Sequence, residues 1–174
     1  MDDAVEELEE LSALVAELVD LATDQHSAAD AFEEIDLAES AERVADRWRR
    51  RRDGSIEVTG DSTTTSGNPA LIDRALANLV ENAAKWSADA AVIDIEVEGG
   101  RVSVRDRGPG IDPAERERVF DRFYRSPGSQ DRPGSGLGLA IVKQIVDAHG
   151  GTVFIEDPDA GPGVVVGFAL PTPE

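Results

Sequence analysis

The chain has 174 residues, of which 40% are hydrophobic and 30% charged, enough to bury a core as one compact domain with an appendage. Its formal net charge of -19 argues against nucleic acid or an anionic membrane as a direct partner, because both attract clusters of lysine and arginine. The absence of cysteine excludes disulfides and fits a cytoplasmic location. No apolar run approaches membrane-spanning length, so we expect a soluble chain, which is also compatible with a piece cut from a membrane protein.

Residues 3–22 are predicted to form one long amphipathic helix. Its apolar residues recur in steps of four and three, the spacing of a coiled-coil or bundle seam, and its glutamates occupy the other side. We interpret residues 1–24 as an oligomerisation segment, followed by a polar linker over residues 25–34. A surface helix packed on its own domain is the alternative.

Residues 35–174 mix helical and strand periodicities, which predicts an α+β domain. A long helix over residues 69–86 opens at Pro69, a residue favoured at the first helical position. In chain order we expect a helix at 39–52, a strand at 55–59, a turn-rich spacer at 61–67, the helix at 69–86, strands at 91–98 and 101–106, a short helix at 113–120, a loop at 122–135, a glycine-started helix ending near residue 149, and strands at 152–155 and 164–170. The predicted fold is a two-layer α/β sandwich, a mixed sheet of about five strands with three helices on one face, preceded by the long amphipathic helix.

Arginines gather at the end of the predicted helix 39–52. Arg47 and the four arginines at 49–52 form this basic end. We interpret it as a solvated face that complements the helix C-terminus, with phosphate docking as the alternative.

The most informative stretch begins at Gly134, where glycines alternate with other residues directly before an apolar helix. Gly134, Gly136 and Gly138 let a backbone approach an anion closely, and the amides at a helix start favour negative charge. Glycines before a helix also serve simple packing, so this motif needs support from elsewhere in the chain.

Polar residues on the helix 69–86 provide that support. Asn78, Asn82 and Lys85 stand at i, i+4 and i+7 and therefore share one helical face. Carboxamide oxygens suit magnesium beside substrate phosphates, and a lysine offers those phosphates a point charge. A polar outer stripe on an amphipathic helix is the alternative.

A third motif, Asp106-x-Gly108-x-Gly110, follows a predicted strand. A buried carboxylate at a strand end can accept a hydrogen bond from an exocyclic amine such as that of adenine, and the glycines would let the backbone approach a flat ring. An ordinary strand-end turn explains the motif equally well on its own.

Together, these motifs resemble the catalytic ATP-binding domain of bacterial sensor histidine kinases, which share a Bergerat-type nucleotide fold with gyrase and Hsp90. The resemblance covers residues 35–171 and is strongest to actinobacterial, stress-responsive kinases of the MprB type. It rests on the motifs above and on two sequence segments, Asn82-Ala83-Ala84-Lys85-Trp86-Ser87 and Phe120-Asp121-Arg122-Phe123-Tyr124-Arg125.

The resemblance implies ATP and Mg²⁺ as cofactors and assigns roles residue by residue. Asn82, assisted by Asn78, would coordinate magnesium, and Lys85 and Arg125 would contact phosphate. At the adenine, Trp86 would pack beside the ring, Asp106 would bind the amine, and Gly108 and Gly110 would shape the pocket. Phe120 and Phe123 would anchor a lid over ATP, from which Arg122 would make a second phosphate contact. The lid hinge and its backbone amides would be provided by Gly134, Gly136, Leu137 and Gly138.

The related ATPases of the gyrase class, which this chain resembles, have a glutamate that activates water at the corresponding position. Here position 78 is asparagine. Without a base there, spontaneous hydrolysis should be slow and the γ-phosphate preserved for another acceptor, which favours a kinase. Glu81 is either a surface residue or a group that helps to polarise the acceptor.

The phosphoacceptor histidine that the resemblance implies is absent from the chain. His26 lacks the family's flanking residues, and His149 lies before a Gly-Gly helix stop, where a histidine is dipole-stabilised structure. We therefore interpret the chain as the second dimerisation helix plus the catalytic domain, unable to autophosphorylate alone. The implied partners are the missing phosphoacceptor helix, a cognate response regulator and a second copy through residues 3–22, with no nucleic acid and no direct membrane contact; the parent protein would sit in the cell membrane.

Two other functions are compatible with the motifs. A serine kinase of the anti-sigma type shares the fold, although the N-terminal helix disfavours it. A nucleotide-sensing interaction module without transfer activity is the non-enzymatic alternative.

Overall fold

A computed structural model describes residues 32–51, 55–87, 91–127 and 134–173. The amphipathic helix expected at 3–22, most of the linker and the homodimer through that helix lie outside the described residues and stay predictions. The elements are β1 (Glu33–Asp36), α2 (Leu37–Arg49), β2 (Ile56–Gly60), β3 (Thr64–Gly67), α3 (Pro69–Trp86), β4 (Ile93–Glu98), β5 (Arg101–Arg105), the short 3-10 helix η1 (Arg118–Phe120), α4 (Gly138–Ala148), β6 (Thr152–Glu156) and β7 (Val165–Ala169).

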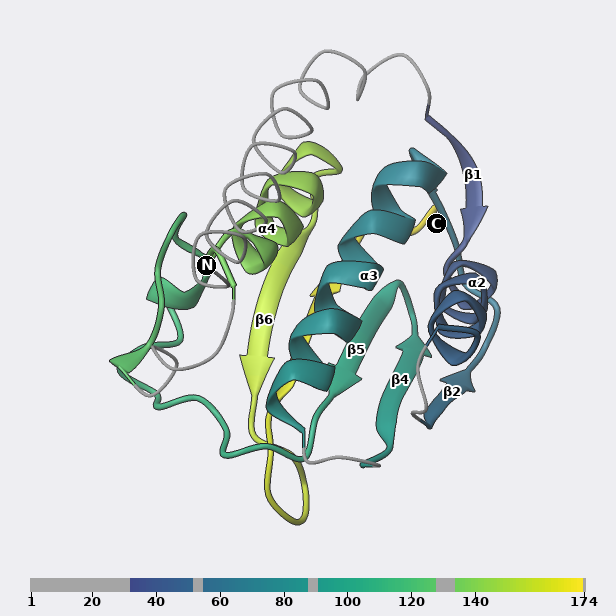
Figure 1. The fold of residues 1–174 in the computed structure, drawn as a ribbon. Helices are drawn as coiled ribbons and strands as arrows, with labels where there is room; N and C mark the ends of the chain where they lie inside the picture. The colour runs from purple at the N-terminus through teal and green to yellow at the C-terminus, as the bar shows by residue number, and fades with distance from the viewer. Residues whose placement is uncertain (1–31, 52–54, 88–90, 128–133, 174) are drawn as a thin grey trace, which may run out of the picture.

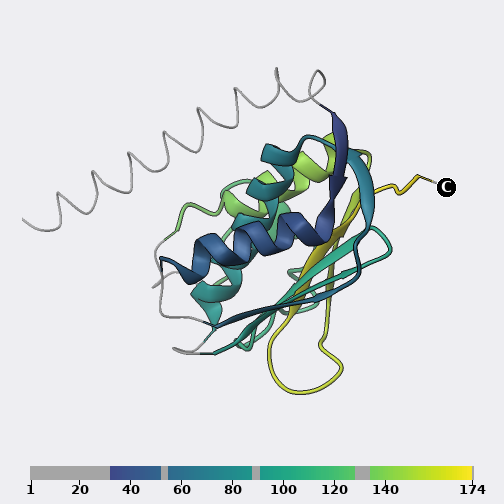
Figure 2. The ribbon, with the colours of Figure 1, turned by 90° about the vertical axis from the view of Figure 1, so that its right-hand side faces the viewer.

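The described residues form two layers, as the sequence predicts. A five-stranded sheet has the order β2-β4-β5-β7-β6, in which β2 and β4 are parallel and the other neighbours are antiparallel. The helices α2, α3 and α4 lie side by side on one face of this sheet (Figures 1 and 2). The α+β sandwich with a mixed sheet is therefore confirmed. Among the described helices, none combines the length and the apolar character needed to cross a bilayer.

The core lies between the helices and the sheet. Along β4, Ile93, Ile95 and Val97 are buried while the residues between them are more exposed, the alternation of a strand with one covered face. α3 contributes its apolar stripe, and its start is set by Asn68, whose side chain accepts hydrogen bonds from the amides of Ala70 and Leu71. This packing leaves the opposite face of α3 for polar residues.

Several of the arginines on α2 are used to hold the domain together. Arg43 and Arg47 both reach Asp73 on α3, at 3.2 and 2.8 Å. Arg49 contacts Glu42 and Asp46 and donates to the Ile56 carbonyl oxygen at 2.8 Å. Arg47 and Arg49 thus serve contacts within the domain rather than a phosphate-docking face.

The expectation of a spacer at 61–67 is wrong, because its second half is β3. This strand pairs with β1 in a separate antiparallel two-stranded sheet, with Thr65 opposite Ile35. β1 begins at Glu33, inside the segment expected as linker. A run of Thr, Ser and Gly has no apolar alternation, so only its distant partner makes it a strand.

The short helix expected at 113–120 is also corrected. Residues 113–117 form turns, and only Arg118–Phe120 is helical, as a 3-10 turn. The segment is too short to repay helix nucleation, and Asp112 instead fixes a local turn by accepting from the Ala114 amide at 2.8 Å.

Candidate functional site

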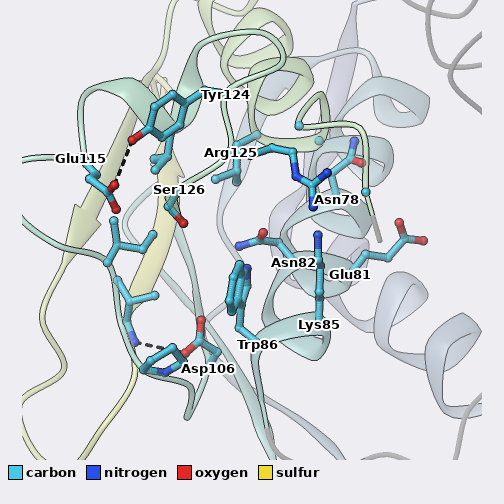
Figure 3. Close-up of a pocket in the computed structure, with 18 of the residues that line it drawn as sticks. Asn78, Glu81, Asn82, Lys85, Trp86, Asp106, Glu115, Tyr124, Arg125 and Ser126 are labelled. Carbon is cyan, nitrogen blue, oxygen red and sulfur yellow. Dashed lines mark hydrogen bonds between the residues drawn. The ribbon is translucent and has the colours of Figure 1, made fainter. Parts of the chain in front are cut away.

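A cavity of about 600 Å³ opens between α3, the loop after β5 and the segments before and at the start of α4 (Figure 3). Most of the site residues expected from the sequence line it. They are Asn78, Asn82, Lys85, Trp86, Asp106, Gly110, Arg125, Gly134, Gly136 and Gly138.

One end of the cavity is polar and carries positive charge. Asn78, Asn82 and Lys85 stand on one face of α3, as their spacing predicts, and Figure 3 shows Arg125 pointing toward them from the opposite wall. Carboxamide oxygens and two cations at one place suit a phosphate chain with its divalent counter-ion.

The glycine motif lies directly against this polar face. A Cβ at Gly134, where φ is +145°, would lie 2.6 Å from Lys85 Nζ, and a Cβ at Gly138 would lie 3.6 Å from Asn78 Oδ1. The positive φ favours glycine at position 134, and a side chain there would displace the end of Lys85. The two motifs form the two walls of one cleft.

The start of α4 has no side-chain cap from its N-cap residue, Leu137. Ser135 Oγ accepts from the Leu137 amide at 3.2 Å. The Leu137 side chain is fully buried in the core, so this residue can reach a ligand in the cavity only through its backbone. The next amides, at the first turn of α4, begin at Gly138 on the cavity wall.

The other end of the cavity contains a buried carboxylate. Asp106 is 2% exposed, and its Oδ1 accepts from the amides of Gly108 at 2.8 Å and Val164 at 3.3 Å. Burial raises the pKa of this carboxyl above its usual value, and the two hydrogen bonds oppose the rise. Trp86 lies beside it in Figure 3, and the apolar Ile111 also lines the cavity, so this end suits a flat ring with an amine.

The glycines after Asp106 act through close backbone approach. A Cβ at Gly108 would lie 2.6 Å from the Trp86 carbonyl oxygen, so glycine here lets the end of α3 pack against the loop. Gly108 is buried and is not part of the cavity wall. Gly110 lines the cavity with φ of +82°.

Three further expected residues do not line the cavity. Phe120 packs, partly buried, against the core. Phe123 is 53% exposed and has φ of +63°. The guanidinium of Arg122 donates to Gln144 Oε1 on α4 at 3.0 Å, so Arg122 and Arg125 differ in direction and only Arg125 faces the cavity.

Sequence reasoning missed two residues that meet at the cavity wall. The Tyr124 hydroxyl donates to Glu115 Oε1 at 3.0 Å, and both side chains line the cavity (Figure 3). Tyr124 belongs to the segment 120–125 on which the resemblance rests, but the resemblance implies no role for it. Nothing in the charged stretch around Glu115 signals a binding residue.

Residues 67–174 match the family described as histidine kinase-, DNA gyrase B- and HSP90-like ATPases. The chain belongs to this family.

The HATPase domain has close relatives among mycobacterial kinases. The chain is 43% identical to the signal transduction histidine-protein kinase/phosphatase MprB of Mycolicibacterium vanbaalenii over 97% of its length, and 42% identical to MprB of Mycobacterium tuberculosis, also over 97%. These matches cover 37% and 35% of the two relatives, so the chain spans little more than a third of their length.

Solved structures agree with the sequence matches. The mycobacterial sensor histidine kinase MprB is 40% identical with a TM-score of 0.72, covering 82% of this chain and 98% of that chain. The full-length ShkA structure in complex with AMPPNP is 27% identical with a TM-score of 0.75, covering 97% of this chain and 38% of that one. The chain therefore contains the catalytic ATP-binding domain of a sensor histidine kinase.

In this HATPase domain His149 links the start of α3 to the end of α4. Its Nε2 accepts from the Asn68 amide at 3.0 Å, and its Nδ1 lies 2.7 Å from the Ile145 carbonyl oxygen, which requires a proton on Nδ1. The ring is buried and stacks on Phe32 with centroids 4.6 Å apart. The structural role expected of His149 is confirmed, but through a neutral ring rather than a cation that the helix dipole stabilises.

Proposed function

We propose that this domain binds ATP with Mg²⁺ and donates the γ-phosphate to a histidine on a dimerisation helix outside this chain. The observation that carries the proposal is the meeting of the glycine motif with Asn78 and Lys85 at one end of a cavity whose other end holds Asp106. A cavity with a cationic, amide-lined end and a buried acceptor at the other has the chemistry of a nucleoside triphosphate site.

The adenine would bind at the Asp106 end. Both hydrogen bonds that Asp106 accepts go to Oδ1 among the described residues, which leaves Oδ2 to accept from the exocyclic amine. Trp86 would pack beside the ring, as the resemblance implies. A guanine would present a carbonyl oxygen to the carboxylate and would be rejected.

The triphosphate would extend toward the start of α4. Lys85 and Arg125 would neutralise its charge, and the backbone around Gly136 and Gly138 would approach its oxygens. The donor set fits magnesium, because the carboxamide oxygens of Asn78 and Asn82 are hard neutral ligands. Magnesium bound there would offset phosphate charge; among the described residues no cluster of His, Cys or acidic side chains offers another metal site.

Position 78 then explains why a transfer enzyme is favoured over an ATPase. Asn78 lines the cavity, yet a carboxamide cannot accept a proton from water as a carboxylate does. Hydrolysis of bound ATP should be slow, and the γ-phosphate would wait for a nucleophile from another segment. Glu81 lines the cavity and is exposed, so an incoming acceptor could reach it.

The partners of the parent protein follow from the same proposal. A phosphoacceptor helix and a response regulator would receive the phosphate, and the parent would sit in a membrane with this domain in the cytoplasm. The names of the relatives, histidine-protein kinase/phosphatase, support this assignment over a serine kinase of the anti-sigma type or a module that only senses nucleotide.

Calorimetric titration with AMP-PNP, with and without magnesium, tests binding. We expect magnesium-dependent binding that Asn82→Ala weakens at least tenfold. Unchanged magnesium dependence in Asn82→Ala would remove the metal assignment.

Transfer is tested by adding a separate polypeptide that carries the phosphoacceptor helix. Radiolabelled ATP should then yield acid-labile phosphohistidine on that polypeptide. Acid-stable phosphoserine on a partner, or no label from a domain that binds ATP, would contradict histidine transfer.

A further inference from the structure

Tyr124 is held from two sides at the wall of the cavity. Its hydroxyl donates to Glu115 Oε1 at 3.0 Å, and the Arg118 guanidinium carbon lies 4.5 Å from its ring centroid. The backbone of Glu115 is held in a turn, because its amide donates to the Asp112 carbonyl at 2.8 Å and its carbonyl accepts from the Arg118 amide at 2.9 Å. The tyrosine therefore joins the segment before α4 to a rigid turn.

The preceding residue shows that the backbone here is under constraint. Phe123 adopts φ of +63°, a left-handed conformation that costs a bulky residue about 1 kcal/mol. Its side chain is 53% exposed, so packing of the ring does not repay that cost. The Phe123 amide donates instead to the Gly136 carbonyl at 3.1 Å, and the glycine motif thereby fixes the chain on its other side.

Gly136 lets its backbone pack closely against the backbone of Phe123 and Tyr124. A Cβ at Gly136 would lie 2.8 Å from the Tyr124 carbonyl oxygen and 2.9 Å from the Phe123 carbonyl carbon. The segment that carries Arg125 is thus clamped between Glu115 and the glycine motif.

Tyr124 and Arg125 leave the backbone in opposite directions. Figure 3 shows Tyr124 pointing to Glu115 and Arg125 pointing toward Asn78 and Lys85. We propose that Tyr124 is a positioning residue, whose bond to Glu115 pre-sets Arg125 toward the terminal phosphate of the nucleotide. This inference rests on the proposed function, because it assumes that the cationic end receives phosphate.

The physical benefit is preorganisation. An arginine on an irregular segment loses side-chain and backbone freedom when it binds, and that loss subtracts from the affinity it provides. A tether made before the ligand arrives removes part of that loss without touching the ligand. The effect of the tether must then depend on the presence of Arg125.

A double-mutant cycle measures that dependence. Dissociation constants for AMP-PNP and ADP, each with magnesium, are determined by calorimetry for Tyr124→Phe, Arg125→Ala and the double variant. We expect Tyr124→Phe to weaken AMP-PNP roughly fivefold, as for one lost hydrogen bond, and ADP much less. Arg125→Ala should weaken AMP-PNP roughly tenfold or more, and the double variant should match Arg125→Ala alone.

Matched variants separate the tether from charge and from folding. Glu115→Leu removes the acceptor for the hydroxyl and should resemble Tyr124→Phe. Arg122→Ala removes the same charge from the same segment but from a side chain that faces Gln144, and it should leave AMP-PNP affinity unchanged. Thermal unfolding of each variant reports whether it folds.

The outcomes are distinguishable. Equal losses from Tyr124→Phe with and without Arg125 would overturn the positioning role, and so would a loss that is the same for ADP as for AMP-PNP. Normal AMP-PNP binding by Tyr124→Phe would overturn it while leaving the proposed function intact. Failure of the parent chain to bind AMP-PNP at all would overturn both.

Discussion

Gly134 and Lys85 meet across the cavity, where a Cβ at Gly134 would lie 2.6 Å from the lysine Nζ. The two residues come from motifs that are far apart in the sequence, and these motifs form the two walls of the cavity. Its consequence is that position 134 tolerates no side chain unless the lysine moves.

We therefore predict that Gly134→Ala weakens ATP binding about tenfold. The methyl group would displace Lys85 and strain a backbone with φ of +145°. Gly99→Ala is the matched control, because Gly99 also has positive φ, +55°, but faces open space. Calorimetric titration should show a loss for Gly134→Ala alone; equal losses in both variants would mean that strain, not the contact, is responsible.

The two lysines of the chain provide a second test. Lys85 lines the cavity, whereas Lys143 lies on the exposed side of α4 and pairs with Asp147 at 3.0 Å. Lys85→Ala should weaken ATP binding roughly tenfold by removing a phosphate-facing charge, and Lys143→Ala should leave it within about twofold. The same affinity for both variants would contradict the placement of the phosphates.

Asp106 should show a trade-off between stability and binding. Burial raises the pKa of its carboxyl in the folded state above the ordinary 3.8, so the folded state holds this proton more tightly than the unfolded state. Its contribution to folding stability therefore falls as pH rises from 3.8 through the folded pKa, and stays at the lower level above it.

Asp106→Asn removes that buried charge and keeps an oxygen for the amides of Gly108 and Val164. We expect a higher Tm than the parent chain at neutral pH, no such difference under acid, and ATP binding weakened at least tenfold. In the parent chain ATP affinity should fall as pH drops through the folded pKa, because a protonated carboxyl no longer accepts from the adenine amine. Melting curves and titrations over a pH series check both; a lower Tm for the variant at neutral pH would contradict the charge argument.

The parts that the sequence predicted well are those with a regular local period. The helix at Pro69–Trp86 was predicted to the residue, because Pro69 marks its start and its apolar stripe is continuous. The same period placed Asn78, Asn82 and Lys85 on one face. The alternating glycines required a backbone turn whatever lay opposite, so their place at a helix start was also foreseeable.

The parts that could not be predicted depend on contacts between irregular segments. Arg122 and Arg125 are close in the chain, and only the turn around Phe123 decides which of them faces the cavity. Tyr124 meets Glu115 because of turns with no periodic pattern. β3 exists only because β1 pairs with it, and neither strand has an alternating signal of its own.

His149 provides a prediction about folding stability. Its ring connects Asn68, the cap of α3, to the Ile145 carbonyl on α4, with Phe32 stacked on it. His149→Ala removes both hydrogen bonds and the stack, and should lower the free energy of unfolding by about 2–3 kcal/mol. His149→Gln, which can restore one of these bonds, should lose less. Denaturant unfolding measures the loss, and a loss under 1 kcal/mol would contradict a structural role.

The same residue tests whether the chain labels itself. Because both ring nitrogens of His149 are engaged and the ring is buried, neither can attack a phosphate in the cavity. Incubation of the chain alone with radiolabelled ATP should therefore give no phosphohistidine at position 149, and the parent chain and His149→Gln should give the same background. Acid-labile label that disappears in His149→Gln would show that this histidine leaves its bonds to Asn68 and Ile145, and the structural account of it would fail.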